Sequence, residues 1–353
     1  MPPNLSYVPA KRPTQANGSG LAAVAERAGV SLATASRVLA GSTHRVSGDL
    51  RDRVLHAAEV LDYVPNASAR SLIMGTRKIV GVLQHDMLDF FTATNIRALE
   101  EVADRAGWLI MLVNASGSVE KELRYLRMFR AERVGAIILM GSGLDDDGYR
   151  AMLTRELNGF VKSGGRVATA GRHDLPCTEF VPDNVAGAQA AIEYLLSNGH
   201  HRIGIISSPS AIIGTRERIT GAKRAFAHAG VPWNEGLVVE GDHRRASGSI
   251  ACEQLLTRNP DVTAIFAMSD EMALGVYDVA HKRGLSIPDE LSVVGYDDTT
   301  IARDVTPALT TVIYPNSELA RRAMEACLSD APLEAAQLLI PCELIVRKSV
   351  ARV

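Results

Sequence analysis

The sequence predicts an α/β protein with a helix-turn-helix head of three helices, a linker or hinge helix, and two doubly wound α/β subdomains. Three observations support this fold class. Residues 21–61 hold apolar side chains at helical spacing and no strand pattern. From residue 77 onward, short apolar runs alternate with amphipathic stretches, as in parallel sheets covered by helices on both faces. These runs are too many for one compact sheet, and they fall into two series.

Residues 21–40 are expected to form two short helices joined by a tight turn. Gly29 is placed to end the first helix in a left-handed conformation, and Ser31 to cap the second through its side-chain oxygen. The second helix turns a small, partly hydroxylated face outward, formed by Leu32, Ala33, Thr34, Ser36 and Arg37. Such a face fits against a DNA major groove, although an ordinary helical hairpin has the same pattern. A third helix is expected from its N-cap, Ser47, to Leu61.

Two segments beside the head are expected to have little stability of their own. Residues 1–18 hold four prolines and no periodicity, which is typical of a disordered leader. Residues 65–76 allow one or two helical turns, too few for an isolated helix. We expect this segment to be either a linker or a hinge helix that folds only against a partner. The head itself then covers residues 19–64.

Charge is unevenly distributed along the chain. Residues 1–78 carry ten Lys and Arg against five Asp and Glu, a net charge of +5, whereas the whole chain of 353 residues carries −2. The remainder therefore carries −7. A basic head on an acidic body indicates that only the head meets a polyanion.

The sequence shows no pattern that requires a metal, a cofactor or a membrane. The four cysteines are far apart and have neither zinc-type nor disulfide-type spacing, so no cofactor is expected. Residues 145–148 resemble a fragment of a calcium loop but lack its Glu ligand and spacing, and an acidic surface turn is expected there. We expect a cytoplasmic protein, because neither a signal peptide nor a membrane-length apolar run is visible.

Beyond the head, strands and helices are predicted in alternation. The strands are expected at residues 78–83, 108–113, 136–140, 166–170, 203–207, 237–240, 264–267, 291–296 and 309–313. The helices are expected at residues 94–106, 119–129, 184–197, 216–229, 246–257, 271–283 and 317–327. Residues 338–346 end the chain in an extended segment. Doubly wound subdomains bind ligands at the carboxyl ends of their strands.

Motifs spread over about residues 20–350 resemble the lac repressor/galactose repressor family of bacterial transcription regulators. They occur in the family's order: Val24-Ala-Glu-Arg-Ala-Gly-Val-Ser31, Leu61-Asp-Tyr-Val-Pro-Asn66, Ala69-Arg-Ser-Leu72, Asn198-Gly-His-His-Arg-Ile203, Arg218-Ile-Thr-Gly221, Met268-Ser-Asp-Glu-Met-Ala-Leu-Gly275 and Leu291-Ser-Val-Val-Gly-Tyr-Asp-Asp298. The resemblance implies a core like that of periplasmic sugar-binding proteins. Its first subdomain is expected at about 77–178 with 310–330, and its second at about 179–308 with 335–350.

The resemblance also implies how the head meets double-stranded operator DNA. Leu32 and Ala33 occupy the family's main specificity positions, where they can touch thymine methyls but cannot make bidentate bonds to bases. Arg37 can reach a guanine or a phosphate. Phosphate contacts are expected from Thr34, Ser36, His44 and Arg45. In the hinge, Asn66 and Ala69 are expected at the DNA, with Leu72 wedged into the minor groove.

A small-molecule effector is expected between the core subdomains, where Arg218 and Asp297 can each bind sugar hydroxyls. Ser269 and Asp270 end the strand at 264–267, and His243 follows the strand at 237–240. Asp183 either contacts the effector or caps the helix at 184. Phe90 or Phe91 is expected to stack on a sugar face or to pack in the core.

The sequence therefore predicts a repressor that binds operator DNA as a homodimer under the control of a sugar-like effector. A purine or nucleoside effector is the alternative within the same family. The chain ends soon after Lys348 with no heptad tail, and the resemblance then implies a dimer. A solute-binding protein would need a signal peptide and no head. An enzyme is disfavoured because no dinucleotide-binding, phosphate-loop or nucleophile-elbow motif is found.

Overall fold

The computed structural model describes residues 20–39, 46–64, 77–87 and 92–353. The predicted leader and the whole predicted hinge segment, residues 65–76, therefore lie outside the described residues. The chain divides into two compact units, Met1–Arg77 and Lys78–Val353. Each unit is described by itself.

The described part of the head consists of three short helices around a small apolar core. The helices are α1 (Leu21–Ala28), α2 (Leu32–Leu39) and α3 (Gly48–Val60). Val24, Ala35 and Val54, one from each helix, are completely buried. A core this small can hold only a few buried side chains, so the turns between the helices matter for its stability.

Two of the three predicted helix-end signals in the head are confirmed. Gly29 has φ 65° and ends α1 in the left-handed conformation, and Ser31 Oγ accepts a bond from the Thr34 amide at 3.2 Å. The predicted side-chain cap by Ser47 is wrong. Its backbone carbonyl accepts from the amides of Leu50 and Arg51, while its side chain makes no capping hydrogen bond.

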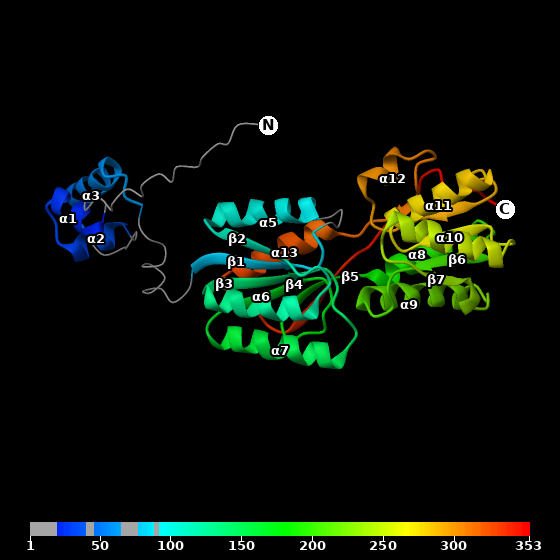
Figure 1. Cartoon of the computed structure of the whole chain (residues 1–353), viewed down its shortest axis with the longest axis horizontal. Coiled ribbons are helices and arrows are strands. Elements are labelled where there is room, and N and C mark those ends of the chain that lie inside the picture. Colours follow the sequence, from blue (N-terminus) through cyan, green and yellow to red (C-terminus); the bar gives the residue numbers. More distant parts are fainter. Residues whose placement is uncertain (1–19, 40–45, 65–76, 88–91) are drawn as a thin grey trace, which may run out of the picture. The chain divides into compact units, whose positions relative to one another are not determined.

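The first sheet of the core has six strands in the order β11-β5-β4-β3-β1-β2, seen near the centre of Figure 1. The strands are β1 (Arg77–Gln84), β2 (Leu109–Asn114), β3 (Val134–Met140), β4 (Arg166–Ala170), β5 (Thr178–Pro182) and β11 (Ala336–Ile340). Helices α5 (Thr92–Ala106) and α13 (Asn316–Leu328) share one apolar cluster with this sheet. Helices α6 (Val119–Ala131) and α7 (Asp147–Lys162) share the other. Both faces of the sheet are thus covered, as predicted.

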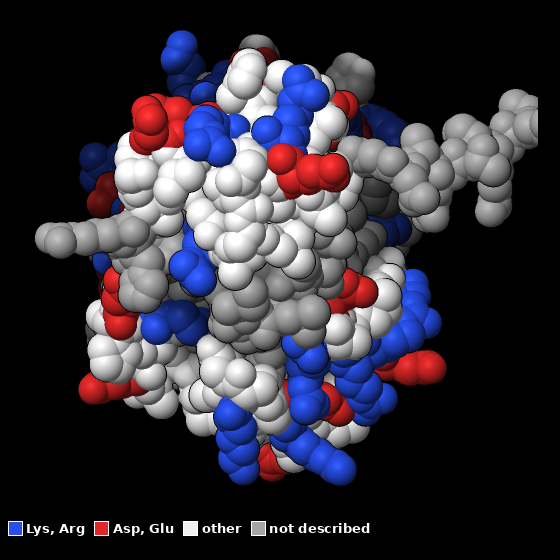
Figure 2. Space-filling view, turned by 90° about the vertical axis from the view of Figure 1, so that its left-hand side faces the viewer, with Lys and Arg blue, Asp and Glu red and all other residues white. Residues whose placement is uncertain are grey.

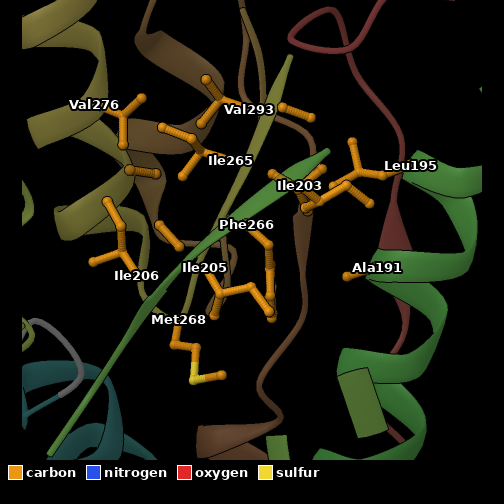
Figure 3. Packing of buried hydrophobic residues seen from close by; sticks show 14 of the residues in the cluster. Ala191, Leu195, Ile203, Ile205, Ile206, Ile265, Phe266, Met268, Val276 and Val293 are labelled. Atoms are coloured by element: carbon orange, nitrogen blue, oxygen red, sulfur yellow. The ribbon is translucent and has the colours of Figure 1, made fainter. Parts of the chain in front are cut away.

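The second sheet has four parallel strands in the order β7-β6-β8-β9. The strands are β6 (Ile203–Ser207), β7 (Val238–Glu240), β8 (Ala264–Ala267) and β9 (Ser292–Val294). The associated helices are α8 (Asn184–Ser197), α9 (Ile213–His228), η1 (Glu235–Leu237), α10 (Arg245–Arg258), α11 (Asp270–Arg283) and α12 (Thr300–Asp304). Figure 3 shows Leu195 of α8 and Val276 of α11 pointing toward the sheet residues Ile203, Ile206 and Ile265.

The chain passes between the two sheets three times, which corrects the predicted subdomain boundaries. Strand β5 belongs to the first sheet, and β11 pairs with it in parallel from Ala336 to Ile340. The expectation that residues 179–182 and 336–340 belong to the second subdomain is therefore wrong. Strand β10 (Thr311–Val312) pairs with β12 (Leu344–Ile345), and Thr310 forms a bridge with Val294 of the second sheet. Residues 310–313 thus lie with the second sheet. We call residues 78–182 and 314–340 the first subdomain, and 183–313 and 341–353 the second.

The structure also contains a helix where the sequence predicted an acidic turn. Asp146 Oδ1 accepts from the Tyr149 amide at 2.6 Å, and this cap starts the sixteen-residue helix α7. The acidic residues here complement the positive end of a helix dipole. Within the described ranges, no helix is long and apolar enough to cross a membrane.

Candidate functional site

The outer face of α2 is the candidate DNA interface of the head. Leu32 is 53% exposed, Ala33 and Arg37 are also exposed, and Thr34 and Ser36 are half-buried. Thr34 Oγ1 lies 2.8 Å from Ser31 Oγ, so its hydroxyl takes part in the start of the helix. The order of exposure agrees with the predicted outward face, but contact of these residues with DNA stays a prediction.

Two further arginines of the head, Arg27 and Arg51, are also exposed. Arg53, on α3, donates instead to the carbonyls of Ala28 and Gly29 and so ties α3 to the end of α1. Figure 2 shows Lys and Arg side chains at several places on the face it views, with Asp and Glu side chains among them and wide areas of other residues between. The predicted DNA contacts His44, Arg45, Asn66, Ala69 and Leu72 lie outside the described residues.

Arg218, on α9, is the centre of the candidate effector site in the core. Its guanidinium carbon lies 3.7 Å from the centroid of the Tyr296 ring, and only 7% of the residue is exposed. Nε donates to Asn184 Oδ1 at 3.1 Å, and Nη1 donates to the Met268 carbonyl at 2.6 Å. The packed ring and the fixed acceptors hold the guanidinium in one orientation.

Asp297 faces Arg218, as the sequence predicted. Its Oδ1 lies 4.0 Å from Arg218 Nη2, and its side chain is 14% exposed. Its backbone has φ 119°, outside the usual range of residues with a side chain. Such strain persists only where the surroundings impose it, and here the residue follows the end of β9. The pair is therefore held at the carboxyl end of the second sheet.

Asn184 and Glu217 complete this cluster, and the sequence analysis did not select them. Asn184 Nδ2 donates to Glu217 Oε2 at 2.8 Å, and Asn184 Oδ1 accepts from Tyr296 Oη at 3.2 Å. Burial raises the pKa of Glu217 above its usual range, against the opposing effects of the Asn184 bond and the Arg172 charge. Glu217 directly precedes Arg218 in the sequence, and this adjacency could have identified it as a candidate site residue.

His243 lies close to the same cluster. Its Nδ1 is 3.1 Å from Ser208 Oγ, and its backbone has φ 70°. His243 is exposed to solvent, yet the surrounding protein together with the Arg218 charge lowers its pKa to about 4. The imidazole is therefore neutral near pH 7 and can both donate and accept a hydrogen bond.

Three other predicted effector residues have structural roles. Asp270 is 0% exposed, and its carboxylate accepts from the Thr299 amide and from the hydroxyls of Thr299 and Thr311. Its assignment to the effector is corrected, since no oxygen of this buried group faces outward. Ser269 caps α11 at the Met272 amide, and Asp183 caps α8 at the Ala186 amide. Phe90 and Phe91 lie outside the described residues.

Several contacts join the two subdomains beside this cluster. Glu217 Oε1 pairs with Arg172 Nε at 2.7 Å, and Asp86 Oδ2 lies 3.8 Å from Arg244 Nη2. Asp145 pairs with Arg216. In the part of the chain that the structure describes, no group of three or more His, Cys, Asp or Glu side chains is arranged to hold a metal ion.

Comparison with known proteins gives these sites a context. Residues 21–66 match the family model of bacterial regulatory proteins of the lacI family, and residues 192–350 match that of a periplasmic binding protein-like domain. The HTH-type transcriptional repressor PurR of Photobacterium profundum is 32% identical over 332 residues, 93% of this chain and 97% of that protein. This chain belongs to the lacI family. The HTH-type transcriptional regulator GalS of Salmonella typhimurium is 35% identical over 314 residues, 87% of this chain and 88% of its own.

Solved structures of lacI-family proteins share the fold over nearly the whole chain. The lac repressor dimer bound to operator and the anti-inducer ONPF is 25% identical, with a TM-score of 0.82 and coverage of 95% of this chain and 100% of that one. The complex of the transcriptional regulator CelR with cellobiose is 29% identical, with a TM-score of 0.69 and coverage of 96% and 100%. The chain is thus a DNA-binding transcriptional regulator with an effector-binding core, and the relatives named here are regulators and not enzymes.

Proposed function

We propose that the protein is a repressor that binds operator DNA as a homodimer and is controlled by an effector bound beside Arg218 and Asp297. The observation that carries this proposal is the buried, fixed Arg218 facing Asp297 at the carboxyl end of the second sheet. A guanidinium and a carboxylate held in place can each bind two hydroxyls or two ring atoms of a ligand. Relatives named as repressors, and a related dimer solved on its operator, support the DNA-binding part.

The charges around this site favour an uncharged effector. Arg172, Arg216, Arg218 and Arg244 each lie beside a carboxylate, and His243 is neutral near pH 7. A phosphate or carboxylate ligand would have to displace one of these acids from its arginine. Neutral sugars therefore fit best, and the related complex with cellobiose supports a sugar. A neutral purine base or nucleoside is the second candidate, favoured by the relatives named PurR and by the half-buried Tyr314 ring beside Arg218.

Two measurements test the proposal. Fluorescence anisotropy with DNA from the protein's own promoter region is expected to show tight, salt-sensitive binding by a dimer. A thermal-shift screen of neutral sugars, purine bases, nucleosides and their phosphates is expected to raise the melting temperature only with uncharged compounds. Absence of specific DNA binding would contradict the repressor, and stabilisation by sugar phosphates alone would contradict the uncharged effector. The protein is proposed to act in the cytoplasm and to leave its effector chemically unchanged.

A further inference from the structure

Three successive residues of α9 contact different parts of the core. Arg216 pairs with Asp145 of the first subdomain, and Glu217 pairs with Arg172, which follows β4 of the same subdomain. The next residue, Arg218, contacts Asn184 and Asp297 in its own subdomain. One helical turn thus carries both the arginine of the candidate effector site and the bonds to the other subdomain.

These contacts form one continuous chain of polar groups. Arg172 binds one oxygen of Glu217, whose other oxygen accepts from Asn184 Nδ2 at 2.8 Å. Asn184 Oδ1 in turn accepts from Arg218 Nε at 3.1 Å. Asn184 is 2% exposed, and the Glu217 side chain is 14% exposed. Arg172 and Glu217 form an ion pair, whereas the contacts of Asn184 with Glu217 and Arg218 are hydrogen bonds. Because little water competes at these positions, each contact constrains the next group.

The backbone beside this chain is also joined across the subdomains. The Ile213 amide donates to the Gly143 carbonyl at 3.0 Å, and the Gly214 amide donates to Ser142 Oγ at 3.0 Å. The Asp145 amide donates to the Ala211 carbonyl at 2.8 Å. The start of α9 is therefore anchored to the loop after β3. Arg218 therefore lies on a helix whose first residues are bonded to the first subdomain.

We propose that Glu217 is a positioning residue that ties Arg218 to the first subdomain through Asn184 on one side and Arg172 on the other. The description of Arg218 as effector-binding rests on the function proposed above. Glu217 faces Arg172 with one carboxylate oxygen and accepts from Asn184 with the other, so a shift of the carboxylate changes both contacts. An effector that changes the bonds of Arg218 changes, through this chain, how the two subdomains are held.

A double-mutant cycle on the full-length chain tests this link without any ligand. The side chains of Arg172 and Arg218 are linked through Glu217 and Asn184, so Arg172→Gln and Arg218→Lys should be coupled. We expect a coupling of at least about fivefold in the unfolding equilibrium constant, measured by urea unfolding. The same cycle in a Glu217→Ala background should show no coupling. If Glu217 merely adds stability, Glu217→Ala should lower the unfolding midpoint and leave the coupling between Arg172 and Arg218 unchanged.

A matched control pairs Arg172→Gln with Arg202→Gln, which removes an arginine bound to Asp261 in the second subdomain, and additivity is expected there. Should Glu217→Ala fail to fold, Glu217→Gln serves as the background. Its amide oxygen can still accept from Asn184, but it lacks the negative charge that pairs with Arg172. Additive changes at Arg172 and Arg218 in the wild-type background would overturn the proposal. Binding of the wild-type chain to promoter DNA, measured on the same preparation, tests the proposed function separately.

Discussion

Tyr296 and Arg218 share one hydrogen-bond acceptor while the guanidinium lies over the ring. Tyr296 Oη and Arg218 Nε both donate to Asn184 Oδ1, at 3.2 and 3.1 Å. The aromatic face and the common acceptor therefore restrict Arg218 from two directions. The site is organised before a ligand arrives, which lowers the entropic cost of binding.

This relationship gives a first prediction, on the hydroxyl and the ring of Tyr296. Tyr296→Phe removes one bond to Asn184 and should lower the unfolding free energy by about 1 kcal/mol. Tyr296→Ala also removes a ring that is 0% exposed and should cost about 3–5 kcal/mol. Urea unfolding of both variants checks the difference. Equal losses would show that the ring contributes nothing beyond its hydroxyl.

A second prediction concerns Asp297 and the effector. Asp297→Asn keeps a residue that tolerates positive φ but removes the charge facing Arg218, so affinity for the effector found by the thermal-shift screen should fall roughly tenfold to a hundredfold. Binding to promoter DNA without effector should remain measurable. Asp261→Asn, which removes another acid paired with an arginine, is the control and should keep the affinity. Unchanged affinity in Asp297→Asn would place the effector elsewhere.

A third prediction distinguishes the contact of Arg37 with the operator from the insertion of Leu72 into the minor groove. Arg37→Ala should weaken operator binding by about 1–3 kcal/mol, because the exposed end of α2 loses its cation. Leu72→Ala rests on the sequence alone and should weaken specific binding far more than non-specific binding, since a wedge acts only when DNA is kinked. Anisotropy with operator and with unrelated DNA measures both. Equal losses on the two DNAs for Leu72→Ala would argue against the wedge.

A fourth prediction concerns pH and His243. Because the pKa of His243 in the folded state is about 4, below its usual value near 6.5, the folded chain binds this proton less readily than the unfolded chain. The stability linked to His243 is present above pH 6.5 and is lost as the pH falls toward 4. His243→Gln should therefore flatten the decline of the urea midpoint between pH 7 and 4. Identical slopes for variant and wild type would contradict this.

A fifth prediction tests the close packing of α10 and α11. A Cβ on Gly275 would lie 2.4 Å from both the Arg245 carbonyl oxygen and the Ser249 nitrogen, and backbone atoms cannot turn aside. Gly275→Ala should therefore lower the unfolding free energy by about 1–3 kcal/mol. Gly48, at the start of α3, has no atom within 4 Å of its ideal Cβ, so Gly48→Ala should be neutral or stabilising. Equal effects in urea unfolding would refute the packing argument.

Local signals explain why the head and most core elements were predictable. The left-handed Gly29 and the capping Ser31 act within a few residues of themselves, and their roles are confirmed. Helix α7 was missed because Asp146 and Asp147 suit both a turn and a helix start. Strand β5 was missed because Glu179, inside it, is an unusual strand residue. Its buried carboxylate accepts backbone amides of the loop before it and the side chain of Gln337, partners that no local pattern reveals.

The candidate effector site was predictable only in part for the same reason. Asp270 and Asp297 both follow strands of the second sheet. Their positions at strand ends do not show which of the two carboxylates faces the candidate effector site. The side chain of Asp270 turns toward Thr299 and Thr311, whereas Asp297 faces Arg218. The direction of each carboxylate depends on residues far away in the chain. Asn184 and Glu217 likewise acquire their roles through partners that the sequence does not place.

The position of β11 has a consequence for biosynthesis. This edge strand comes from residues 336–340 of a 353-residue chain, yet it pairs with β5, which the ribosome makes more than 150 residues earlier. The first subdomain therefore cannot complete its sheet until almost all of the second has been synthesised. Its nascent form exposes the hydrogen-bonding edge of β5 during that interval, and an unpaired edge invites aggregation. A premature stop codon before residue 336 would thus remove a strand from the first subdomain, which is the part of the core synthesised first.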